Sequence, residues 1–200
     1  MKELDLLKKD WQKNDAFEQV SEQDIYTMLH KKSSSVVKWI LIVSILEFVV
    51  LNGIGLLLPD KYQEDIYGID HYLNILQIIS YGVTFFFMYL FYKNYQSSST
   101  TSTTKNLMET ILKTRKTVKY YIGYNLVYFF LIISFISFNV VLKDPIIIKK
   151  TENHFFYAFC IIMILALIII GIVWLFYTLI YGFLLKKLKR NYNELKKIDL

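Results

Sequence analysis

The sequence predicts an all-α, polytopic membrane protein with four transmembrane helices and short amphipathic helices on the cytoplasmic side. Two observations favour this class. Of the 200 residues, 54% are hydrophobic and only 20% are charged, which is too apolar a composition for one soluble core. The hydrophobic residues also gather into four long runs, and these runs are separated by polar segments. Together the two features are typical of a four-span membrane domain.

The expected membrane domain covers residues 36–185. Each apolar run is long enough to cross roughly 30 Å of hydrocarbon at about 1.5 Å of rise per residue. The first run contains Lys38 and Glu47, and the other three contain no charged side chain. The fourth run is longer than a bilayer needs, so it either tilts or continues into the basic tail as one helix. The expected spans are residues 36–58, 72–92, 120–142 and 155–185.

The distribution of Lys and Arg predicts the orientation. Six of them lie between spans two and three and six follow span four, whereas one lies between spans one and two. The positive-inside rule therefore places both termini and the middle segment in the cytoplasm. The basic residues expected at the cytoplasmic membrane surface are Lys31, Lys32, Lys38, Arg115, Lys116, Lys119, Lys186, Lys187, Lys189 and Arg190.

Aromatic residues are frequent near the expected cytoplasmic ends of the spans. Amphipathic rings favour the headgroup layer, so we interpret these residues as a membrane-anchoring belt. The belt comprises Trp39, Tyr89, Tyr92, Tyr95, Tyr120, Tyr121, Tyr177 and Tyr181.

The first 35 residues form an expected cytoplasmic head of amphipathic helices. Helical spacing places apolar residues of the first fifteen positions on one face. In SEQD, Ser21 is expected to cap a second helix, with Asp24 at the capping-box position. An apolar stripe follows on that helix. The residues expected to dock a protein partner are Leu4, Leu7, Trp11, Ile25, Met28 and Leu29.

Two further cytoplasmic segments have the same amphipathic character. The middle loop, residues 93–119, begins with the hydroxyl-rich run QSSSTTSTT, which is expected to be mobile because it can bury little. The rest of this loop and the tail, residues 186–200, carry apolar residues at helical spacing. These segments either pack on one another, lie on anionic headgroups, or bind a protein partner. Nucleic acid is not expected, because the N-terminal segment as far as Lys38 has seven basic and seven acidic residues.

Glu47 is the only acidic residue within the expected spans. An ionised carboxylate is costly in lipid, so Glu47 is expected to face the bundle interior with Ser44 on a similar face. One interpretation is a structural hydrogen bond to Tyr or Asn on a neighbouring span. The alternative is a small proton-coupled transporter that uses Glu47.

The sequence contains no recognisable catalytic motif. It has no Gly-rich phosphate loop, no HExxH helix and no GxSxG turn. Three histidines in separate segments and one cysteine offer little to a metal ion. No catalytic residue, metal or cofactor is therefore expected, and the protein is expected not to be an enzyme.

The head of the chain carries a resemblance to a known family. ELDLLKKDWQ followed by SEQDIYTMLHKKSSSVVKWILIVSILEF resembles an uncharacterised family of four-span inner-membrane proteins from Bacteroidota. Members are often encoded beside an RNA polymerase sigma factor and sometimes carry the name beta-carotene monooxygenase. The resemblance covers chiefly residues 3–48. It implies a regulatory or scaffolding protein of the bacterial inner membrane with an anti-sigma-like role, in which the head docks the sigma factor. Whether the protein forms a homo-oligomer stays open.

Overall fold

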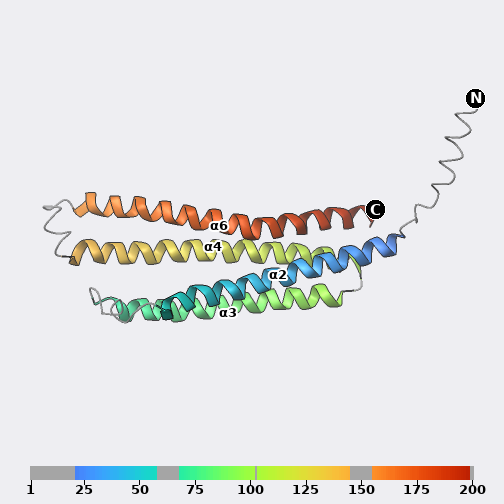
Figure 1. Cartoon of the computed structure of the whole chain (residues 1–200), viewed down its shortest axis with the longest axis horizontal. Helices are drawn as coiled ribbons and strands as arrows, with labels where there is room; N and C mark the ends of the chain where they lie inside the picture. The colour runs from blue at the N-terminus through green and yellow to red at the C-terminus, as the bar shows by residue number, and fades with distance from the viewer. Residues whose placement is uncertain (1–20, 58–67, 102, 145–154, 199–200) are drawn as a thin grey trace, which may run out of the picture.

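Four long helices make up the part of the chain that the computed structural model describes, residues 21–57, 68–101, 103–144 and 155–198. They lie side by side along one axis (Figure 1), and these ranges contain no strand, which confirms the predicted all-α class. The helices are α2 (Glu22–Leu57), α3 (Asp70–Thr100), α4 (Thr104–Lys143) and α6 (Phe155–Ile198).

All four helices are long and apolar enough to cross a membrane. They also extend beyond the predicted spans. The longest, α6, has 44 residues, which corresponds to about 65 Å and roughly twice the thickness of the hydrocarbon layer. Span four and the tail are therefore one continuous helix. The chain is a multi-pass membrane protein whose helices project well beyond the lipid.

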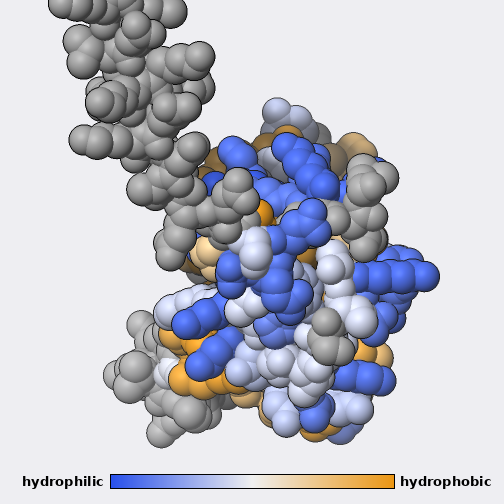
Figure 2. All heavy atoms as spheres, turned by 90° about the vertical axis from the view of Figure 1, so that its right-hand side faces the viewer, coloured by the Kyte–Doolittle hydropathy of each residue, from blue (hydrophilic) through white to orange (hydrophobic). Residues whose placement is uncertain are grey.

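The projecting parts gather at the end of the bundle where α6 ends and α2 begins (Figure 1). We call this region the polar end and define it as residues 21–35, 93–101, 103–119 and 186–198. Figure 2 looks onto this end, and hydrophilic side chains cover most of the visible described surface.

A capping box at Ser21 begins α2, as the sequence predicts. The backbone N–H of Asp24 donates to Ser21 Oγ at 3.1 Å, and the Ser21 hydroxyl donates to Asp24 Oδ2 at 2.7 Å. A capping side chain satisfies an N–H group that has no partner inside the helix. From this start α2 continues without interruption into the first span.

Residues 96–100 of the hydroxyl-rich run are helical, which differs from the expectation of a mobile stretch. Residues 96–100 form the last turns of α3, and α4 begins at Thr104. The Thr100 hydroxyl donates to the Gln96 carbonyl oxygen at 2.9 Å, and Ser97 Oγ and Thr110 Oγ1 share a hydrogen bond at 3.1 Å. These hydroxyls are bonded within α3 and to α4, so the run is part of a helical hairpin.

The amphipathic faces of the polar end pack against one another. Leu107 and Ile111 of α4 and Leu188 and Leu195 of α6 are all fully buried, and Leu29 of α2 joins the same cluster. Mutual packing, one of the alternatives left open for these segments, therefore accounts for their apolar faces. By contrast, many large hydrophobic side chains of the spans are exposed, as expected of surfaces that face lipid.

Candidate functional site

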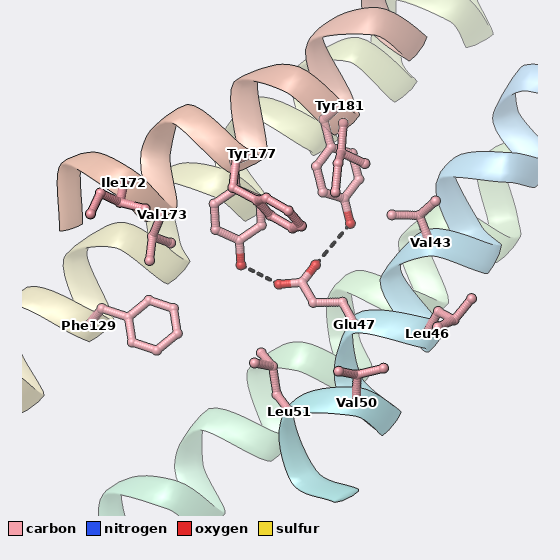
Figure 3. A pocket seen from close by; sticks show the side chains of 12 residues that line it. Val43, Leu46, Glu47, Val50, Leu51, Phe129, Ile172, Val173, Tyr177 and Tyr181 are labelled. Carbon is pink, nitrogen blue, oxygen red and sulfur yellow. Dashed lines mark hydrogen bonds between the residues drawn. The ribbon is translucent and has the colours of Figure 1, made fainter. Parts of the chain in front are cut away.

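Glu47 lies half-buried on α2 and faces α6 (Figure 3). Tyr177 donates a hydrogen bond to its Oε1, and Tyr181 donates to its Oε2 at 3.1 Å. The two tyrosines are four residues apart, so one face of α6 presents both hydroxyls to the same carboxylate. The predicted position of Glu47, turned toward tyrosine donors of a neighbouring span, is confirmed.

The assignment of Tyr177 and Tyr181 to the membrane-anchoring belt is wrong. Their rings are only 5% and 1% exposed, because each hydroxyl reaches an acceptor inside the bundle rather than at the headgroups. Tyr121 is also buried, and its ring contacts both of them at centroid distances of 6.5 and 6.0 Å. Sequence reasoning had one usable signal for this cluster, the i,i+4 spacing of two tyrosines in span four.

Four other residues of the expected belt are exposed, whereas Tyr121 is buried and Tyr95 is half-buried. The rings of Trp39, Tyr89, Tyr92 and Tyr120 are each at least half exposed. Tyr120 also lies under the ammonium group of Lys116, 5.7 Å from the ring centroid. These residues fit an anchoring role at the membrane boundary.

Ser44 is not a hydrogen-bond partner of Glu47. Its side chain is fully buried, and its hydroxyl donates to the carbonyl oxygen of Leu41 at 2.8 Å. A hydroxyl inside a helix commonly bonds the carbonyl one turn back. The predicted pair of Glu47 and Ser44 is therefore replaced by Glu47 with two tyrosines.

A groove of about 510 Å³ lies beside the carboxylate (Figure 3). Its polar side chains are Glu47, Tyr177 and Tyr181, and every other lining residue is apolar. Several of these are more than half exposed, including Leu46, Leu51 and Phe176, so the groove opens on the lipid-facing side of the bundle. The apolar lining comes from α2, α4 and α6: Val43, Leu46, Val50, Leu51, Phe129, Ile172, Val173, Phe176 and Ile180.

The predicted docking residues fall into three groups. Leu4, Leu7 and Trp11 lie outside the described residues. Ile25 and Met28 are 37% and 48% exposed on α2, whereas Leu29 is 3% exposed and belongs to the bundle core. Leu29 therefore supports the polar end from within and is not available to a partner.

The predicted basic surface residues are exposed, with one exception. Arg115 is half-buried, and its Nε atom has no hydrogen-bond partner in the described part of the chain. Lys31, Lys32, Lys38, Lys116, Lys119, Lys186, Lys187, Lys189 and Arg190 are all exposed.

Comparison with known families covers all four helices. A family model described as a domain of unknown function, DUF8845, matches residues 23–200. The chain belongs to this family. The DUF8845 region contains Glu47 and both tyrosines, whereas residues 1–22 of the head lie outside it. Neither the curated proteins nor the solved structures contain a significant match to the chain.

Proposed function

We propose that this DUF8845 protein is a docking protein of the bacterial inner membrane that holds an acidic cytoplasmic protein at the membrane. In this proposal both termini and the polar end are cytoplasmic, and the role is regulatory or scaffolding rather than enzymatic. The observation that carries the proposal is the strongly basic surface of the polar end, which continues far beyond the membrane boundary.

Basic residues greatly outnumber acidic residues on this surface. The described residues of the polar end, together with Lys38 at the membrane boundary, include fifteen Lys and Arg and only four Asp and Glu. Two of the four acidic residues already pair within their own helices, Glu109 with Lys113 and Glu194 with Arg190. The remaining surface therefore carries a large positive charge, which favours an acidic partner.

The distance of the basic residues from the membrane helps to decide whether their charge serves a protein partner or lipid headgroups. Lys105 lies fifteen residues before Tyr120, the predicted start of span three, which is about 22 Å along the helix. Electrostatic attraction between exposed charges is screened over about 8 Å at physiological ionic strength. Headgroups account for the basic residues at the boundary, but a protein partner better explains positive charge at Lys105, Lys196 and Lys197.

A sigma factor is the specific candidate for the partner. The head resembles proteins encoded beside sigma factors, and it directly precedes the basic bundle in the sequence. The exposed Ile25 and Met28 offer apolar contacts next to this surface. Apolar contacts surrounded by charge are typical of protein interfaces, in which charge guides association and apolar contacts stabilise the complex.

The test is a crosslinking pull-down from native membranes with three forms of the full chain. Wild type is compared with a form that lacks residues 1–20 and with the triple variant Lys105→Glu, Lys196→Glu and Lys197→Glu. We expect one acidic cytoplasmic protein with wild type and at least a tenfold loss with the triple variant, because several attractive charges become repulsive.

A matched control places three reversed charges at the membrane boundary, in Lys119→Glu, Lys186→Glu and Lys187→Glu. We expect this control to retain the partner, provided that both variants reach the membrane at the wild-type level. Equal recovery with all forms contradicts the proposal. Capture that disappears after nuclease treatment assigns the basic surface to nucleic acid instead.

A small proton-coupled transporter that uses Glu47 is the second candidate. The observation that favours it is a carboxylate within a predicted span, held by two tyrosine hydroxyls beside a groove. An intramembrane acidic group of this kind is a common part of a proton relay. Loss of substrate-driven proton flux in liposomes after Glu47→Gln would support this candidate, and no flux in wild type under any substrate gradient tested would count against it.

A further inference from the structure

We propose that the groove beside Glu47 binds an amphipathic amine, a molecule with an apolar chain and a single positive charge. The site requires neither a docking partner at the polar end nor a transport step. It follows from the carboxylate and from the lining of the groove.

The carboxylate has no cation beside it among the described residues. Two ion pairs, Lys113 with Glu109 and Arg190 with Glu194, are exposed at the polar end and far from Glu47 in the sequence. On α2 itself, Lys38 lies nine residues before Glu47, which is about 14 Å along the helix. A carboxylate at this depth is costly without a partner of opposite charge. A positively charged ligand supplies that partner.

The tyrosines orient the carboxylate but leave it able to accept more hydrogen bonds. Each oxygen accepts one phenol hydrogen bond, and an ionised carboxylate has about four lone-pair positions. The rings of Tyr177 and Tyr181 lie side by side, with centroids 5.9 Å apart and planes tilted by 32°. Both rings are almost fully buried, so the attraction for a cation at this end of the groove comes from the carboxylate.

The lining of the groove selects an apolar chain for the rest of the ligand. Beyond Glu47 and the tyrosines it offers only apolar side chains, from Val43 on α2 to Ile180 on α6. Its volume of about 510 Å³ lies within the usual range for small-molecule sites of roughly 300–1,000 Å³. The exposed rim at Leu46, Leu51 and Phe176 gives a ligand dissolved in the bilayer direct access.

Photolabelling of the full chain in phosphatidylcholine nanodiscs tests this site. The probe is dodecyltrimethylammonium with a diazirine on its chain, and the comparison is dodecanol with the same diazirine. Labelling of the groove is measured by mass spectrometry and divided by labelling of the lipid-facing Ile78 and Ile79 on α3, which corrects for partitioning into the bilayer.

We expect the ammonium probe to label the groove about tenfold more than the alcohol, since hydrogen bonds to charged groups contribute enough for that factor. In Glu47→Gln the two probes should label equally, because glutamine keeps the shape of the side chain and one acceptor oxygen but has no charge. Val50→Trp fills the groove and keeps the carboxylate, so it should lower labelling by both probes.

Asn52→Leu is the matched control. Asn52 lies on the same helix and accepts a hydrogen bond from Tyr81 of α3, outside the groove. We expect this variant to retain the preference for the ammonium probe. Equal labelling by both probes in wild type overturns the proposal, as does an unchanged preference in Glu47→Gln or unchanged labelling in Val50→Trp.

Discussion

Asn191 of α6 donates a hydrogen bond to Ser33 of α2 at 3.0 Å, across the buried centre of the polar end. The two residues are 1% and 0% exposed. The bond joins the first part of α2 to the last part of α6. The small Ser33 side chain lets α6 approach α2 closely and finds a hydrogen-bond partner there.

Asn191→Ala should lower the free energy of unfolding by about 1–3 kcal/mol, because it leaves the Ser33 hydroxyl buried without its partner. Asn193→Ala, at an exposed position of the same helix, should change it by less than about 0.5 kcal/mol. SDS titration of the full chain in detergent micelles measures both. If Asn191→Ala left the free energy of unfolding unchanged, the bond would contribute nothing to the stability of the polar end.

Leu107→Ala should destabilise the protein by about 2–5 kcal/mol, because Leu107 is fully buried where α4 packs in the polar end. Leu112→Ala, on the same helix but 44% exposed, should have a much smaller effect. Hydrogen exchange of α4 and α6 amides in each variant provides the comparison. Similar protection in the two variants would contradict a packed bundle beyond the spans.

Glu47 and Tyr181 should show energetic coupling in a double-mutant cycle. Glu47→Gln combined with Tyr181→Phe should reveal an interaction of about 1 kcal/mol, which is usual for hydrogen bonds within a membrane. The control cycle pairs Glu47→Gln with Tyr120→Phe, whose ring is exposed, and should give no coupling. The free energy of unfolding of each variant is measured by the same SDS titration. If the effects of Glu47→Gln and Tyr181→Phe simply add, the contact between Glu47 and Tyr181 is contradicted.

Orientation can be tested with single cysteines. Cys160 is replaced by serine, and the exposed Lys197 or His71 is then changed to cysteine. A membrane-impermeant maleimide should label His71→Cys in spheroplasts, whereas Lys197→Cys should react only after the inner membrane is permeabilised. The reverse pattern would place the basic polar end outside the cell.

The membrane domain could be predicted from sequence because length and hydropathy of a helix are local properties. The cap at Ser21 was predictable for the same reason. The partners of Glu47 were not, since Tyr177 lies 130 residues away and no local rule gives the rotation of α6 about its axis. Tyrosines at the same depth suit a headgroup belt or a buried hydrogen bond, and only packing decides between them.

Composition misled the sequence prediction in the hydroxyl-rich run. A polar low-complexity stretch normally buries too little to fold. Here the hydroxyls of Ser99 and Thr100 donate to the carbonyl oxygen of Gln96 within α3. The information that makes this run helical lies in α4, which supplies Thr110 as a partner for Ser97.

The most direct test of the docking proposal places a photocrosslinking amino acid at the exposed position of Lys105 in living cells. A second form carries it at the exposed Ile168 of α6, which faces the membrane. The proposal predicts a crosslink from position 105 to one acidic cytoplasmic protein, identified by mass spectrometry, that is lost when Lys196 and Lys197 are changed to Glu. Crosslinks from position 105 only to lipid, or to the same proteins as position 168, would contradict a docking role for the polar end.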